Sequence, residues 1–231
     1  MFENAIYISN TILLIACIAG YLFTWKYRKY FNISDKTAII VILIQNTSLI
    51  LGGKLLQAFV AGIPMQYVEF IYIGILGSGA FLVAMLALML FSKLTKTSFL
   101  EIIKLCTPSY FLLFSIAKIA CFLQGCCRGM VYDGILSVKY IDNLSVSYFP
   151  IQIVESILFF IIFAIYSYVI KRNKYSNQTF YLITIIAMLV KGICDSFRIT
   201  HVDKVISLSQ VISILIIIIL VILYFKEKHK Q

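Results

Sequence analysis

Charged residues are scarce in this sequence. Only 13% of its 231 residues are charged, 61% are hydrophobic, and the mean hydropathy is +0.97. A water-soluble globule of this length needs far more charge to cover its surface. The composition excludes an ordinary soluble enzyme and indicates a polytopic membrane protein.

The chain also lacks the pattern of a cleavable signal peptide, an internal repeat and a polar stretch long enough for a soluble domain. Glu3 stands where a signal peptide has its basic region, and no small-residue cleavage site follows the first apolar run. We therefore expect one membrane domain that comprises residues 1–231.

Apolar runs of about 20 residues, each long enough to cross a bilayer as a helix, recur along the chain. They predict an all-α fold with seven transmembrane helices. The fourth run is longer than a bilayer needs, so we expect it to tilt or to break at Pro108. The predicted spans are Tyr7–Trp25, Thr37–Val60, Tyr67–Phe91, Phe99–Cys127, Pro150–Ile170, Thr179–Phe197 and Ser207–Phe225.

Basic residues predict the orientation of these spans. The loops after the first, third and fifth spans and the C-terminal tail hold twelve of the 20 Lys and Arg residues. The alternate loops hold Arg128, Lys139, Arg198 and Lys204. Positive residues favour the cytoplasmic side, so we expect the N-terminus outside and the C-terminus in the cytoplasm. The net charge of +10 then reflects anchoring at anionic lipid and does not indicate a nucleic-acid partner.

Ionisable residues within the predicted spans are the candidates for function, because charge in hydrocarbon is costly. Glu101 and Lys104 are three residues apart near a cytoplasmic end, so we expect them to pair with each other. Six others fall in the outer halves of their spans. They are Lys54, Glu69, Lys118, Glu155, Lys191 and Asp195.

Two arrangements explain this one-sided set: a polar cavity that opens to the outer surface, or structural ion pairs between helices. Lys191, Asp195 and Arg198 form one helical stripe, and Gln152 shares a face with Glu155. A cavity with several cations suits a phospholipid headgroup, and a carboxylate there can act as a base. A small-solute transporter would favour polar groups at the midplane and repeat symmetry, which the sequence lacks.

Six segments together resemble the prolipoprotein diacylglyceryl transferase family, and they occur in the family's order through most of the chain. Each motif alone is weak, whereas six in order on seven spans are specific. The segments are GGKLLQAF from Gly52, YIGILG from Tyr72, AKIACFLQGCCRG from Ala117, PIQIVES from Pro150, KGICDSFR from Lys191 and SLSQVIS from Ser207.

The resemblance implies a transferase that moves the diacylglyceryl group of phosphatidylglycerol to the lipobox cysteine of a lipoprotein precursor. The product is a thioether, and glycerol phosphate leaves. The active site would face the extracytoplasmic side of the bacterial cell (inner) membrane. The expected partners are phosphatidylglycerol, the precursor and the bilayer. No cofactor is expected.

The resemblance also implies roles for individual residues. The headgroup-binding set comprises Lys54, Lys118, Gln152, Lys191 and Arg198, with Lys118, Lys191 and Arg198 on the phosphate. The catalytic set comprises Tyr72, Glu155 and Asp195. In it, Tyr72 is the polar group near the thiol, and the two carboxylates position the cations or assist proton transfer.

Several positions depart from the family's pattern. Lysine replaces arginine at 54, 118 and 191, aspartate replaces glutamate at 195, and Cys121 stands in place of asparagine. Lysine keeps the charge but loses the bidentate fork that arginine offers to phosphate. A divergent relative with another lipid or acceptor, a non-catalytic membrane partner protein and a small-solute transporter are therefore the alternatives.

Cys126 and Cys127 raise a separate question at the outer end of the fourth span. The chain's two histidines, His201 and His229, fall on opposite sides of the membrane in this topology, so we expect no metal site. A disulfide to Cys121 or Cys194 and a reactive thiol beside Arg128 are alternatives. The simplest interpretation is a tight helix end in which small thiols pack.

Overall fold

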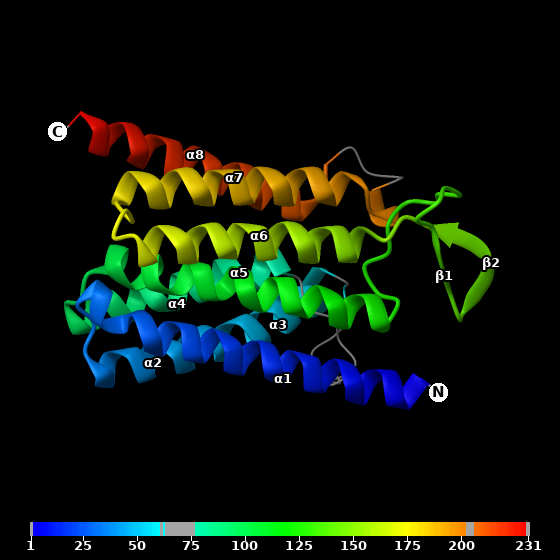
Figure 1. Ribbon diagram of the computed structural model, residues 1–231, viewed down its shortest axis with the longest axis horizontal. Coiled ribbons are helices and arrows are strands. Elements are labelled where there is room, and N and C mark those ends of the chain that lie inside the picture. Colours follow the sequence, from blue (N-terminus) through cyan, green and yellow to red (C-terminus); the bar gives the residue numbers. More distant parts are fainter. Residues whose placement is uncertain (1, 61, 63–76, 202–205, 230–231) are drawn as a thin grey trace. The chain divides into compact units, whose positions relative to one another are not determined.

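The computed structural model describes residues 2–60, 62, 77–201 and 206–229 (Figure 1). The chain divides into two compact units. Unit 1 comprises Met1–Ala19 and Phe111–Gln231, and unit 2 comprises Gly20–Tyr110. Two helices, α1 (Phe2–Tyr27) and α5 (Phe99–Leu123), contribute residues to both units. That all helices form one membrane domain stays a prediction.

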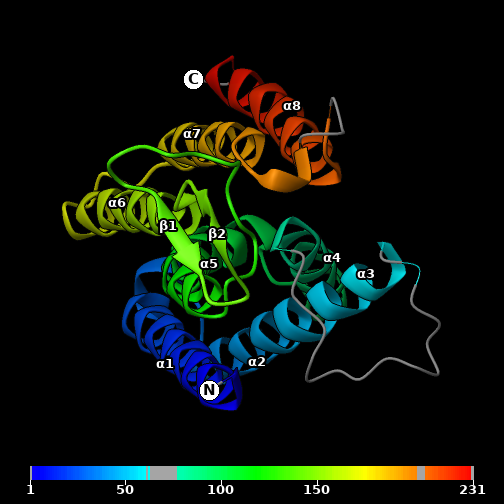
Figure 2. The ribbon, with the colours of Figure 1, turned by 90° about the vertical axis from the view of Figure 1, so that its right-hand side faces the viewer.

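Unit 1 contains three long helices and a small β-hairpin besides its parts of α1 and α5. In the view of Figure 2 the hairpin lies in front of α5 and α6, at the ends of these helices. The strands pair antiparallel, with a register shift between Lys139 and Tyr140. The elements are β1 (Val138–Tyr140), β2 (Asn143–Tyr148), α6 (Ile151–Lys171), α7 (Asn177–Ser196), the 3₁₀ turn Ile199–His201 and α8 (Leu208–Lys228).

Aromatic side chains join α5, α6 and α7 inside unit 1. The ring of Phe159 lies 4.6 Å from that of Phe114 and 5.4 Å from that of Phe111. Tyr166 is fully buried, and its hydroxyl lies 2.6 Å from the hydroxyl of Thr184. Dispersion among closely packed rings and one buried polar pair therefore fix these three helices against each other.

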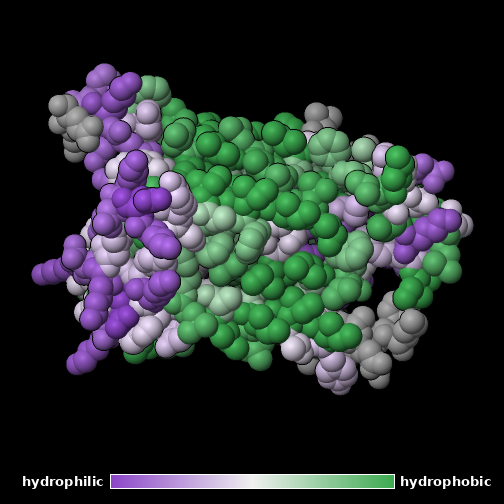
Figure 3. All heavy atoms as spheres, in the orientation of Figure 1, coloured by the Kyte–Doolittle hydropathy of each residue, from purple (hydrophilic) through white to green (hydrophobic). Residues whose placement is uncertain are grey.

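The outer surface of unit 1 is divided between apolar and basic residues. Large apolar side chains of α6 and α8 are exposed along the middle of the helices, as expected where helices face lipid (Figure 3). Exposed basic residues gather where α6 ends, in the turn to α7 and where α8 ends; they are Lys171, Arg172, Lys174, Lys226 and Lys228. The first residues of α6 and the last of α7 lie at the opposite end of this unit (Figure 1).

Unit 2 is a smaller helical assembly. Gln45 donates through Nε2 to the hydroxyl of Ser109 at 3.1 Å, which ties α2 to α5. Lys104 pairs with Glu101 at 2.9 Å, so this predicted pair is confirmed. The elements of unit 2, apart from its parts of α1 and α5, are the 3₁₀ turn Arg28–Phe31, α2 (Asp35–Thr47), the π-helical turn Ser48–Gly52, α3 (Gly53–Val60) and α4 (Gly77–Thr95).

Six helices in the described parts of the chain are long and apolar enough to cross a membrane, and a shorter apolar helix covers Gly79–Thr95. The chain is therefore a mostly helical, multi-pass membrane protein. The predicted third span begins outside the described residues, so seven spans and the orientation stay predictions. The six are Tyr7–Phe31, Asp35–Phe59, Phe99–Leu123, Ile151–Lys171, Asn177–Ser196 and Leu208–Lys228.

The alternative of a break at Pro108 and the predicted end of the fourth span are corrected. Helix α5 continues through Pro108 without a break, because a proline inside a long buried helix costs one hydrogen bond that packing can offset. It ends at Leu123 and not at Cys127, because Gly125 and Cys127 adopt left-handed backbone angles with φ of 66° and 54°. The hairpin that follows departs from the all-α prediction.

Candidate active site

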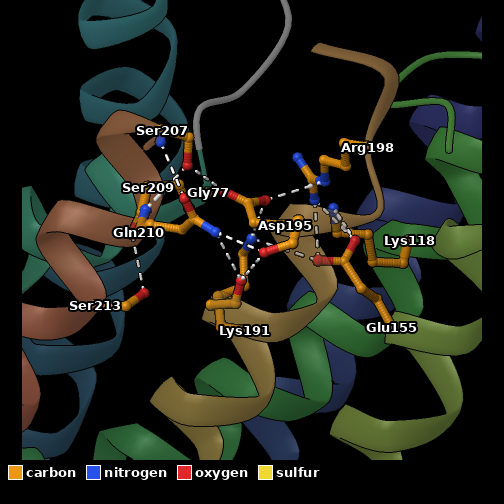
Figure 4. A network of polar contacts seen from close by, with 12 residues as sticks. Gly77, Lys118, Glu155, Lys191, Asp195, Arg198, Ser207, Ser209, Gln210 and Ser213 are labelled. Atoms are coloured by element: carbon orange, nitrogen blue, oxygen red, sulfur yellow. Dashed lines mark hydrogen bonds and ion pairs between the residues drawn. The ribbon is translucent and has the colours of Figure 1, made fainter. Parts of the chain in front are cut away.

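Glu155 lies at the centre of a buried ionic cluster in unit 1 (Figure 4). Its side chain is fully buried, and three cations surround its carboxylate. Lys118 Nζ lies 2.8 Å from Oε2, and the Arg198 guanidinium lies 2.8 and 2.9 Å from the two oxygens. Lys191 Nζ lies 3.4 Å from Oε1. One carboxylate thus joins α5, α6, α7 and the residues after α7.

Asp195 forms the second negative centre of the same cluster. Lys191 Nζ lies 2.7 Å from its Oδ1, and Arg198 Nε lies 3.1 Å from that oxygen. The hydroxyl of Ser207 donates to the other oxygen, Oδ2, at 2.8 Å. The contacts of Glu155 with Lys118 and Lys191 match the interhelical ion pairs that the sequence left as one of two arrangements.

The elements that carry these side chains explain why the charges meet. Lys191 and Asp195 are four residues apart on α7 and so lie on one face of the helix. Ser207 is the N-cap of α8: its hydroxyl accepts the backbone N–H of Gln210, whose side chain caps Ser207 in return. Since α7 and α8 pack against each other, this cap brings the Ser207 hydroxyl to Asp195.

Arg198 lies beyond α7 and is held by backbone pairing with the loop after α5. Met130 donates its N–H to the carbonyl of Phe197 at 2.8 Å, and Ile199 donates to the carbonyl of Arg128 at 3.1 Å. At Gly129, any Cβ would collide with the backbone carbonyl of Phe149, so only glycine allows this approach. The loop therefore fixes the position of the guanidinium.

The cluster carries an excess of positive charge. Lys118, Lys191 and Arg198 face two carboxylates, so one positive charge is unbalanced when all five groups are ionised. Burial alone would lower the pKa of Arg198, but the neighbouring Glu155, Cys127 and Asp195 raise it above its usual value. Arg198 therefore stays charged, and the cluster favours an anion beside it.

Gln152 Oε1 is buried at this end of unit 1 without a hydrogen-bond partner among the described residues, whereas the buried Arg198 Nε has only its ion pair with Asp195 at 3.1 Å. Gln152 donates through Nε2 to the Cys126 carbonyl at 2.7 Å and also lies 2.9 Å from the hydroxyl of Tyr140. The carbonyl partner requires the amide nitrogen on that side, which leaves Oε1 as an acceptor. The site thus offers one unpaired acceptor, Gln152 Oε1, to a ligand.

Six of the eight residues predicted from the sequence meet directly or lie on the same helix face in unit 1: Lys118, Gln152, Glu155, Lys191, Asp195 and Arg198. Tyr72 lies outside the described residues, as does Glu69. Lys54 is half-buried on α3 in unit 2.

The sequence reasoning missed the role of Ser207 at Asp195. A serine followed three residues later by glutamine, just before an apolar run, is the signature of a capping box, so the cap itself was detectable. It also missed Tyr140, which reaches Gln152 from the unforeseen hairpin.

The cysteines lie next to the ionic cluster. All six cysteines are free, and the thiols of Cys121, Cys126 and Cys127 lie within 4.8 Å of one another. Hydrogen bonds with Cys121 and Cys126, together with the charges of Lys118 and Arg198, lower the pKa of Cys127 well below its usual value although burial opposes this. The same thiol contacts raise the pKa of Cys126.

Comparison with protein-family models matches residues 5–226 to the prolipoprotein diacylglyceryl transferase model. The chain belongs to the prolipoprotein diacylglyceryl transferase family. The resemblance inferred from six short segments is thereby confirmed over nearly the whole chain. A comparison with curated proteins finds no match.

Membership of the prolipoprotein diacylglyceryl transferase family gives the cluster a chemical context. The family implies a membrane transferase that acts on lipoprotein precursors and lipids. Every residue of the ionic cluster lies within the matched range.

Proposed function

We propose that this chain transfers the diacylglyceryl group of phosphatidylglycerol to the lipobox cysteine of a lipoprotein precursor. The observation that carries the proposal is the buried cluster around Glu155, with one positive charge in excess. A phosphodiester headgroup carries one negative charge, so it balances the cluster. Its acyl chains remain in the bilayer beside the exposed apolar surfaces of α6 and α8.

The proposed reaction needs positive charge close to the leaving group. The precursor's sulfur attacks the glyceryl carbon that bears the phosphate ester. A carbon–sulfur bond forms, the carbon–oxygen bond breaks, and the thiol proton passes to water. Glycerol phosphate leaves with the electron pair, and its phosphate gains a second negative charge. Fixed cations therefore stabilise the transition state more strongly than they stabilise the bound lipid.

In this proposal Lys118, Lys191 and Arg198 bind the phosphate, and a phosphate oxygen would compete with Asp195 for Arg198 Nε. Glu155 and Asp195 hold these cations in place. A carboxylate surrounded by three cations is a weak base, so positioning suits Glu155 better than proton transfer does.

The remaining predicted residues complete the proposed site. Gln152 Oε1 would accept a hydrogen bond from a hydroxyl of the glycerol headgroup. Tyr72 would be the polar group near the substrate thiol, and Lys54 would add a further cation, both by resemblance to the family.

We place the site at the outer leaflet of a bacterial cell membrane. The support is the separation of charge within unit 1: exposed basic residues gather at one end of α6 and α8, and the ionic cluster lies at the other end of α6. Under the positive-inside rule the basic end faces the cytoplasm.

A different anionic lipid or a different acceptor is the second candidate. The observation that favours it is the pair of lysines at the cluster, Lys118 and Lys191, because an ammonium group binds phosphate as a point charge and lacks the geometry of a guanidinium fork. A site with these lysines would select less strictly among the headgroups of anionic lipids.

Transfer in vitro tests the proposal. Purified protein in detergent is given phosphatidylglycerol with a radiolabelled glycerol headgroup and a peptide that contains a lipobox cysteine. We expect release of labelled glycerol phosphate and a thioether on the peptide, seen by mass spectrometry. Lys118→Met should lower the rate by about 100-fold, since it removes a cation from the departing phosphate, and Lys118→Arg should retain activity within about tenfold.

Lys104→Met is the matched control, because Lys104 is also a buried lysine in an ion pair but belongs to unit 2. It should leave the rate unchanged. A well-folded protein that releases nothing from phosphatidylglycerol, while a second anionic lipid yields a modified peptide, would move the assignment to the second candidate. Equal loss in Lys118→Met and Lys104→Met would contradict the proposed phosphate site.

A further inference from the structure

Three thiols converge where α5 ends. The Sγ atoms of Cys121, Cys126 and Cys127 lie within 4.8 Å of one another, and each residue is only partly buried. The backbone produces this convergence: Cys126 donates its N–H to the Cys121 carbonyl at 3.1 Å, and Gly125 and Cys127 are left-handed.

The left-handed conformation of Cys127 is the second unusual feature. A non-glycine residue with φ of 54° pays about 1–2 kcal/mol, and cysteine lacks the short amide or carboxylate that eases this conformation in Asn or Asp. Such strained residues concentrate at functional sites. Here the left-handed residues Gly125 and Cys127 flank Cys126, and both consecutive thiols lie close to Cys121.

We propose that Cys121, Cys126 and Cys127 form a binding site for a soft monovalent metal ion, Cu(I). Thiolates select soft ions such as Cu(I). Three sulfurs at about 2.3 Å around one ion in a plane lie about 4 Å apart, so the thiols need only small movements. The cluster has three members among the described residues, which suits a three-coordinate ion better than zinc, which takes four ligands.

The surrounding charge agrees with this assignment. One Cu(I) with three thiolates carries a net charge of −2, and the positive charges of Lys118 and Arg198 reach Cys127. The cations of the ionic cluster, whose charge Glu155 and Asp195 balance except for one unit, offset part of the charge of the metal–thiolate group in a setting of low dielectric constant.

A bound metal would restrain the loop after α5, which pairs with the backbone around Arg198 of the ionic cluster. The Cys126 carbonyl holds Gln152, and the next residues, Arg128 and Met130, pair with the backbone on both sides of Arg198. A metal bond from α5 to this loop would limit its movement. The inference goes beyond lipid transfer and does not depend on it.

Metal binding to the full chain tests the site. The protein is purified in detergent under anaerobic, reducing conditions, and Cu(I) is titrated against a chromophoric chelator. We expect one tightly bound Cu(I) per chain, with a sulfur-only shell near 2.3 Å in X-ray absorption. Cys121→Asn, which introduces the residue typical of the family, should weaken binding by about 100-fold or more. Replacing all three thiols by serine should abolish it.

Cys17→Ser is the control, because Cys17 is a partly exposed thiol of α1 outside the cluster. It should bind Cu(I) as the parent chain does. Unchanged binding in a folded Cys121→Asn variant, nitrogen or oxygen ligands in the absorption spectrum, or a disulfide between two of these cysteines in the anaerobic protein would each overturn the assignment.

Discussion

Glu155 is the residue on which the ionic cluster depends. Its side chain is fully buried, and its single carboxylate is shared by Lys118, Lys191 and Arg198. A buried ion pair contributes little net stability when it forms, but removal of one partner leaves an uncompensated charge. Loss of Glu155 would leave three cations close together with only Asp195 to balance them.

Glu155→Gln should therefore lower the free energy of unfolding by about 3–5 kcal/mol, because it neutralises the shared partner and keeps the side-chain volume. Thermal unfolding in detergent measures the change. Glu101→Gln is the matched control: Glu101 also pairs with one lysine, but its side chain is one third exposed, so the loss should be about 0–1 kcal/mol. Equal losses for the two variants would mean that the cluster is not buried from solvent.

At the scale of elements, the N-terminus of α8 both caps a helix and supports the site. Ser207 closes a capping box with Gln210, and its hydroxyl donates to Asp195. Gln210 also donates to the Gly192 carbonyl at 3.1 Å, so the start of α8 is tied to the last turns of α7. The helix end and the ionic cluster should therefore respond together to one substitution.

Ser207→Ala should cost about 2–3 kcal/mol of unfolding free energy, from the lost cap and the lost hydrogen bond to a carboxylate, and should slow transfer. Ser176→Ala isolates the capping part, because Ser176 caps α7 through the N–H of Thr179 without touching the cluster. It should cost about 1 kcal/mol and leave the transfer rate unchanged. If both variants behave alike in unfolding and in transfer, the hydrogen bond to Asp195 has no functional role.

Element boundaries and contacts show which features of the fold can be predicted from the sequence. Apolar length predicts α1, α6, α7 and α8 to within a few residues, because a lipid-facing helix needs a continuous apolar run. Helical spacing also predicts the shared face of Lys191 and Asp195. The hairpin escapes prediction because its strands are short and their pairing depends on contacts with other segments.

The same limit applies to the candidate site. Charge in hydrocarbon marked Lys118 and Glu155 as functional candidates, since such residues are rare in spans. Which cation meets which carboxylate could not be predicted, because Arg198 is positioned by backbone pairing with the loop at Gly129. The sequence left Cys121 and Cys194 as alternative neighbours of Cys126 and Cys127, and the convergence of three thiols at Cys121 could not be predicted because it accompanies two left-handed residues, Gly125 and Cys127.

At the scale of the whole molecule, the predicted orientation decides which substrates reach the site. The basic end of unit 1 and the ionic cluster lie at opposite ends of α6. If the basic end faces the cytoplasm, the loop between α5 and β1 faces outward together with the cluster. Exported lipoprotein precursors and outer-leaflet lipids would then have access from the same side.

Accessibility of single cysteines tests this orientation in cells. In a background with all native cysteines replaced by serine, Ile135→Cys marks the fully exposed loop before β1, and Lys228→Cys marks the exposed end of α8. A membrane-impermeant maleimide should label Ile135→Cys in intact spheroplasts and should label Lys228→Cys only after permeabilisation. The opposite pattern would place the cluster on the cytoplasmic side, where precursors that have crossed the membrane cannot reach it, and the proposed transfer at the outer leaflet would be wrong.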